Sequence, residues 1–128
     1  MKHVKEVNIA GLKVHLAYCY ATETGFRELA DEDIRVYLTD TIENVKNGFE
    51  PDKDKAVKLL LAAATAYSEG MGVEEELTAH DLMYEAEIDE IFTAVGAVIQ
   101  LYMSFYKIPS GEPKTEEPDE KEEDPKNA

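Results

Sequence analysis

The chain has 128 residues, of which 44% are hydrophobic, and a formal net charge of −15 from 28 acidic and 13 basic residues. This length favours a single folded domain. An acidic surface repels phosphate backbones and anionic lipids, so the charge argues against nucleic-acid binding and membrane-surface binding and favours solubility and basic partners. Cys19 is the only cysteine, which excludes an internal disulfide and suits a reducing compartment. With neither a signal-peptide pattern nor an uninterrupted apolar run of about 18 residues, a cytoplasmic protein without a membrane span is expected.

Residues 3–18 predict a β-hairpin with its turn at Ala10-Gly11. In that register Ile9 faces Leu12 and Val7 faces Val14, which collects the apolar side chains on one face of the hairpin. Ala-Gly is not a favoured pair for a two-residue loop, so a bulged or longer turn is an alternative. A hairpin alone is not stable in water, so this one should lie on helices or pair with another chain.

Three helical stretches are expected next, over about residues 21–30, 32–47 and 52–68. The second begins with acidic residues, which complement the helix dipole. The third is apolar almost all round, which is typical of a central helix that is covered on several sides.

Two more helices, over about residues 79–86 and 88–106, should complete the folded part. Thr78 and Asp81 are spaced as in a capping box, and the last helix repeats apolar residues at i, i+3, i+4 and i+7. A kink or break near residues 86–89 is favoured over one continuous helix. Residues 109–128 hold four prolines and eight acids, a composition that predicts disorder.

The predicted fold is therefore α+β and mainly α. An N-terminal β-hairpin packs on a four- to five-helix bundle within a single domain over residues 1–108, and a disordered acidic C-terminal tail follows. The predicted core contains Val14, Leu16, Phe26, Leu38, Ile42, Leu60, Ala63, Leu82, Ile91, Phe92, Val95 and Ile99.

No pattern for chemistry is present in the sequence. The three histidines and Cys19 lack the close spacing of zinc ligands, and the acidic stretches lack the pattern of a calcium loop. A glycine-rich phosphate loop and a nucleophile elbow are also missing. We therefore expect a protein that is not an enzyme and that needs no cofactor or metal.

Several stretches of the sequence resemble a known family. These are LKVHLAYCYATETGFREL at residues 12–29, DEDI at 31–34, KAVKLLLAAATAY at 55–67, DLMYEA at 81–86 and FYKIPSGEPK at 105–114. Together they resemble the tail assembly chaperone group of long-tailed phages and prophages, which are small proteins encoded next to the tape-measure protein. The resemblance extends over about residues 8–114.

The resemblance implies a non-enzymatic protein of the host cell cytoplasm that binds the long helical tape-measure or another tail protein and keeps it soluble during tail assembly. It is also compatible with a homo-oligomer. The partner surface is expected on the helices at 52–68 and 88–106, with these residues: Leu60, Ala64, Tyr67, Ala94, Ala97, Tyr102 and Tyr106. Two alternatives stay open. One is a small acidic interaction or inhibitor module, such as a nucleic-acid mimic, and the other is a plain structural or oligomerisation protein.

Overall fold

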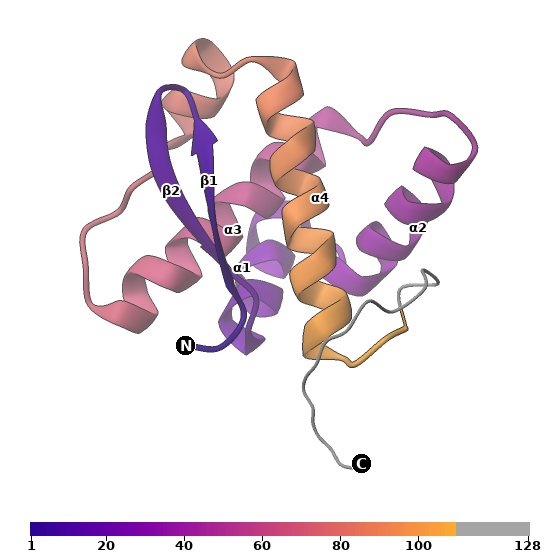
Figure 1. Ribbon diagram of the computed structural model, residues 1–128, viewed down its shortest axis with the longest axis horizontal. Coiled ribbons are helices and arrows are strands. Elements are labelled where there is room, and N and C mark those ends of the chain that lie inside the picture. Colours follow the sequence, from indigo (N-terminus) through magenta and orange to yellow (C-terminus); the bar gives the residue numbers. More distant parts are fainter. Residues whose placement is uncertain (110–128) are drawn as a thin grey trace, which may run out of the picture.

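An antiparallel β-hairpin packs on about five helices in a mainly helical α+β fold, as the sequence predicts (Figure 1). This computed structural model describes residues 1–109, and the predicted disordered tail over 109–128 lies outside that range except for Pro109. The elements are β1 (Val4–Ile9), β2 (Leu12–Ala17), α1 (Tyr20–Ala30), α2 (Ile34–Lys46), α3 (Lys53–Met71), the π-helical turn η1 (Asp81–Glu85) and α4 (Ile88–Phe105).

The hairpin has the predicted register, with Ile9 opposite Leu12 and Val7 opposite Val14. Ile9 and Val14 are fully buried against the helices, whereas Leu12 beside the turn is 37% exposed. The apolar face of the hairpin is therefore the face that packs on the helices. This arrangement supplies the cover that an isolated two-stranded hairpin needs for stability.

The hairpin closes through a two-residue turn, and the bulged or longer alternative is not observed. Ala10 and Gly11 both have positive φ, 56° and 76°, which is unfavourable for an alanine. A tertiary hydrogen bond stabilises this conformation, because the Ala10 N–H donates to Oε1 of Glu90 at 3.1 Å. The same oxygen accepts the Glu87 N–H at 3.0 Å, so one carboxylate joins the hairpin turn to the start of α4.

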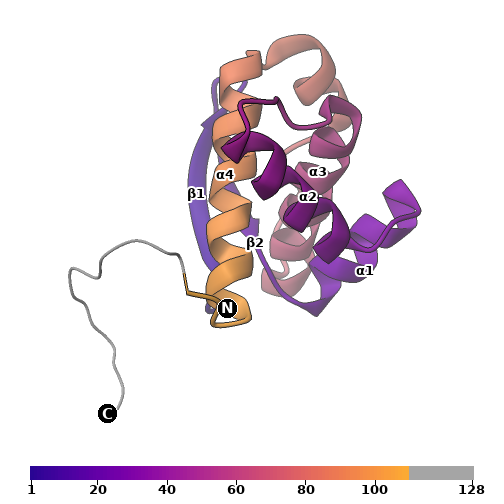
Figure 2. The same cartoon turned by 90° about the vertical axis from the view of Figure 1, so that its right-hand side faces the viewer.

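Helix α4 lies between the hairpin on one side and the other helices on the opposite side (Figure 2). Its buried stripe is Ile91, Ala94, Val95, Val98, Leu101 and Tyr102. By length and composition alone α4 could also cross a membrane. The expectation of no membrane span therefore stays a prediction, although the buried stripe of α4 packs against β1 and α3.

Several helix boundaries differ from the prediction because of specific caps. Asp31 adopts a left-handed conformation that ends α1, and α2, expected from residue 32, begins at Ile34 because Asp33 caps it by accepting the Arg35 N–H at 2.8 Å. Helix α3 runs on to Met71 and ends at Gly72. The expected helix over 79–86 is mainly the short turn η1, and the predicted break follows it at Ala86, which is extended.

The predicted core is largely correct, but three of its members are only half-buried: Ile42, Phe92 and Ile99. The buried residues of α2 (Ile34, Tyr37, Leu38 and Thr41) lie in its first eight positions. Beyond Thr41 the helix separates from the core, and Val45 is 53% exposed. The three half-buried side chains therefore line an open groove, described below.

Replacing Val95 with aspartate should unfold the domain. Val95 is 1% exposed on the buried stripe of α4, where a carboxylate would have neither water nor a partner. An uncompensated buried charge costs about 3–5 kcal/mol, which is comparable to the total stability of a small domain. Thermal melting followed by circular dichroism measures the loss. Thr93→Asp, on the exposed side of the same helix, should melt close to wild type, and equal melting of both variants would contradict the packing of α4.

Replacing Glu90 with glutamine should remove part of the acid sensitivity of the fold. The backbone N–H groups of Ala10 and Glu87 lower the pKa of Glu90 below its ordinary value of 4.5. A lowered folded-state pKa stabilises the protein above the unfolded-state pKa, and this contribution is lost as the pH falls through the folded-state pKa. The difference in urea unfolding free energy between wild type and Glu90→Gln should therefore be constant above about pH 5.5 and shrink below pH 4.5. Glu74→Gln, in the exposed loop after α3, is the control, and a gap that does not change with pH would contradict the role of Glu90.

Candidate functional site

An apolar groove between α2 and α4 is the first candidate site. It has a volume of about 600 Å³. Its walls come from the second half of α2, the α2–α3 loop and the middle of α4. The lining residues are Thr41, Ile42, Val45, Lys46, Gly48, Phe49, Glu50, Pro51, Phe92, Val95, Gly96 and Ile99. Most of these side chains are apolar, so the groove suits an apolar ligand surface.

The groove remains open because α2 separates from the core beyond Thr41 and because Gly96, which has no side chain, forms the floor on α4. Phe49, in the middle of the α2–α3 loop, is 66% exposed. On α4 the floor is Gly96, where an added Cβ would meet no atom within 4 Å. The loop itself is held at its far end, because the Tyr37 hydroxyl donates to the Asp52 carbonyl at 3.2 Å. The hydrogen bond between Tyr37 and Asp52 thus keeps the α2 side of the groove in place.

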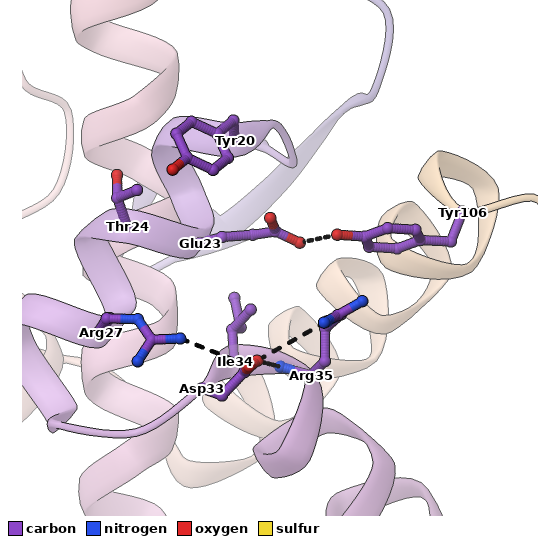
Figure 3. A pocket seen from close by; sticks show the side chains of 8 residues that line it. All are labelled: Tyr20, Glu23, Thr24, Arg27, Asp33, Ile34, Arg35 and Tyr106. Atoms are coloured by element: carbon purple, nitrogen blue, oxygen red, sulfur yellow. Dashed lines mark hydrogen bonds and ion pairs between the residues drawn. The ribbon is translucent and has the colours of Figure 1, made fainter.

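A second, polar pocket of about 210 Å³ lies where α1, the start of α2 and the end of α4 meet (Figure 3). Its lining residues are Tyr20, Glu23, Thr24, Arg27, Asp33, Ile34, Arg35 and Tyr106. At its centre the Glu23 carboxylate accepts two tyrosine hydroxyls on the same oxygen. One comes from Tyr18 at 2.8 Å and the other from Tyr106. This carboxylate therefore joins the exit of β2 to the end of α4.

Both arginines of the chain line this pocket, and both lie near Asp33. Arg27 Nη2 is 3.5 Å from Asp33 Oδ2, and Arg35 Nε is 3.9 Å from Asp33 Oδ1. The Arg35 guanidinium also lies 5.6 Å from the centre of the Tyr106 ring, which is a cation–π distance. The two arginine side chains are 65% and 56% exposed, so these ion pairs add little to stability.

The tyrosines around Glu23 have raised pKa values. Burial, followed by the hydrogen bond to Glu23, raises the pKa of Tyr18 far above its ordinary value of 10.0. At Tyr106 the hydrogen bond to Glu23 is the main cause of the raised pKa, and burial is second. Both hydroxyls therefore stay protonated as donors over the physiological range, and the network does not titrate through its tyrosines.

Four of the residues expected at a partner surface lie in the core. Leu60 and Ala94 are fully buried, Ala64 is almost so, and Tyr102 is 7% exposed. Their apolar character therefore serves packing in this fold, and a partner has no direct access to them. Their role in binding remains a prediction, since no partner is present.

The other three expected residues are more accessible. Tyr67 is half-buried and stacks on the His15 ring at 4.6 Å between centroids, and Ala97 is half-buried on α4. Tyr106 is 37% exposed and lies at the edge of the polar pocket, so it is the expected residue nearest to a candidate site. The sequence analysis did not single out Phe49, Phe92 or the arginine pair as a site. Phe49 and Phe92 come together where α2 and its following loop face α4, and the arginines come together across the α1–α2 loop, and no local pattern encodes either arrangement.

Within residues 1–109, no group of three or more histidine, cysteine or acidic side chains is arranged to hold a metal ion. His15 instead contacts Glu76, with its Nδ1 3.0 Å from Oε2, and this contact holds the loop after α3 against β2. Comparison of the chain with protein-family models, curated proteins and solved structures gives no match.

Replacing Tyr18 with phenylalanine should make the protein less sensitive to alkali. In the unfolded chain Tyr18 ionises near its ordinary pKa of 10.0, whereas the folded protein holds the hydroxyl protonated. Its stabilising contribution is therefore present below pH 10 and is lost as the pH rises above that value. Tyr18→Phe should lose about 1 kcal/mol at neutral pH with its hydrogen bond and should show a flatter stability profile between about pH 9 and 11.5. Urea titrations measure both effects, and Tyr20→Phe is the control because Tyr20 is 73% exposed. Parallel pH profiles for wild type and Tyr18→Phe would contradict the shift.

Proposed function

We propose that this chain is a non-enzymatic protein-binding module that holds an apolar helical segment of a partner in the groove between α2 and α4. The observation that carries the proposal is the groove itself, which is open, apolar and bordered by the exposed Phe49. With the family resemblance described above, the role that fits best is that of a phage tail assembly chaperone. Its partner would be the long helical tape-measure protein or another tail protein in the host cytoplasm.

The dimensions of the groove suit a helix. Phe92 and Ile99 on α4 are seven residues apart, so the lined stretch is about 10 Å long, or two helical turns. An amphipathic helix that enters such a groove presents apolar residues at i, i+3, i+4 and i+7. Each fully buried leucine or phenylalanine contributes about 1.5–3 kcal/mol. When the entropic cost of association is subtracted from the binding free energy of two or three such anchors, one segment is expected to bind weakly.

Weak binding to each segment is compatible with the proposed role. A tape-measure helix is long and repeatedly apolar, so many copies of a small chaperone would be bound along it. The net charge of −15 would keep such a coated complex soluble and would disfavour nucleic acid and membrane surfaces as partners. Self-association of the free chaperone, as a homo-oligomer, is compatible with the same apolar surface.

Filling the groove from its floor should abolish partner binding without harming the fold. In Gly96→Leu the new side chain would start in open space and project into the groove. Leucine also has a better helix propensity than glycine, so stability should be unchanged or higher by up to about 1 kcal/mol. When co-expressed with the neighbouring tape-measure protein, wild type should give a soluble complex. Gly96→Leu should reduce the recovered complex about tenfold or more, since one or two anchors lose their place.

The matched control is Thr93→Leu, which adds the same side chain to the exposed side of α4. It should leave the complex intact. If wild type yields no soluble complex, or if Gly96→Leu and Thr93→Leu behave alike, the groove is not the binding site and the proposal fails. Complex formation that disappears in high salt for both variants would instead favour the acidic-mimic alternative, which depends on charge.

A further inference from the structure

The groove and the polar pocket lie along one seam between α2 and α4. On α4, Phe92 and Ile99 line the groove, and Tyr106, another seven residues on, lines the pocket. On α2, Ile42 lines the groove and Arg35, seven residues earlier, lines the pocket. Positions seven apart fall on the same face of a helix, so both helices turn one continuous face towards the seam. A docked helix that follows the seam from Phe92 to Tyr106 would run about 21 Å.

The polar end of the seam is where the chain places both of its arginines, although its net charge is −15. The two carboxylates in the pocket are already engaged. Asp33 accepts the Arg35 N–H as the cap of α2, and Glu23 accepts the hydroxyls of Tyr18 and Tyr106. By contrast, the pairs that Arg27 and Arg35 form with Asp33 are long, at 3.5 and 3.9 Å.

The guanidinium groups therefore keep donors for a ligand. Each guanidinium has five N–H donors in a planar fork that matches a carboxylate. Among the described residues, Arg27 donates one side-chain hydrogen bond, to Asp33. Arg35 is oriented by the Tyr106 ring beneath it, so its position is restricted before any ligand arrives. An acidic group that docks beside these side chains would meet two guanidinium groups that are more than half exposed and that flank the Asp33 carboxylate (Figure 3).

We propose that the helix bound in the groove carries an aspartate or glutamate about two turns beyond its apolar anchors, and that Arg27 and Arg35 bind this carboxylate. The inference rests on the proposed function, because it concerns the partner of the same groove. The apolar end supplies the affinity, whereas the arginine end sets the register and direction of the docked helix. A segment with its acid at the other end would meet Lys46 and Glu50 of the groove instead of the two arginines and would lose this contact.

Two fluorescent helical peptides test the inference. Both carry leucine at i, i+3, i+4 and i+7, and position i+14 is glutamate in one and glutamine in the other. Fluorescence anisotropy with the full chain should give about three- to tenfold tighter binding of the glutamate peptide, as expected for a partly exposed charge-assisted pair. The double variant Arg27→Gln/Arg35→Gln should bind both peptides with the affinity of the glutamine peptide. Lys13→Gln/Lys5→Gln, with the same charge change on the hairpin, should keep the preference.

The outcomes separate this inference from the proposed function. Equal binding of the two peptides to wild type, with loss of both in Gly96→Leu, overturns the arginine contact and leaves the groove proposal standing. Failure of both peptides to bind wild type overturns both proposals. If neither peptide binds and Gly96→Leu dissociates a concentration-dependent dimer seen in light scattering, a second copy is the occupant, which also overturns the inference. Recovery of binding when Arg35→Glu is paired with a lysine at i+14 supports it directly.

Discussion

The burial of α4 is the constraint on which the rest of the structure depends. This helix has apolar residues over more of its circumference than one neighbour can cover, and it takes the hairpin on one side and α3 on the other. Those contacts bury the stripe that includes Val95 and Val98. The remaining apolar strip, with Phe92 and Ile99, faces α2, and α2 covers it only in part. The groove is therefore a consequence of how much apolar surface α4 presents and how little of it the other elements within residues 1–109 cover.

Two carboxylates hold α4 in place at its ends. At the start, Glu90 accepts the N–H groups of Ala10 and Glu87, which connects the hairpin turn to the first turn of the helix. At the end, Glu23 accepts the Tyr106 hydroxyl, and Arg35 lies over the same ring. These polar contacts are directional, and at the surface they form without a large desolvation cost. The apolar contacts in the middle of the helix are not directional. The Glu90 contacts connect α4 to the hairpin, and the Tyr106 contacts connect its end to α1 and α2, at the polar end of the seam.

The sequence predicted those features that depend on local patterns. Alternation around Ala10-Gly11 was enough for the hairpin register, and the spacing of Thr78 and Asp81 was enough for a helix start, where the two residues exchange hydrogen bonds as expected. Periodicity alone could not tell a covered apolar residue from an uncovered one, so Ile42, Phe92 and Ile99 were assigned to the core. The path of α2 after Thr41 decides that question. The approach of both Arg27 and Arg35 to Asp33 likewise depends on tertiary geometry.

The shape of the groove also restricts which kind of helix could be kept soluble by binding in it. A docked helix would bury one stripe against α2 and α4, while its opposite face would remain in solvent. A segment that is apolar all round would therefore stay insoluble with a single copy bound and would need several copies around or along it. An amphipathic segment would need only one. Several bound copies, each with a charge of −15, would give the coated assembly a large negative charge that keeps it apart from other assemblies. The same repulsion limits how densely the copies can pack, so the partner has to supply enough apolar contact per copy to overcome it.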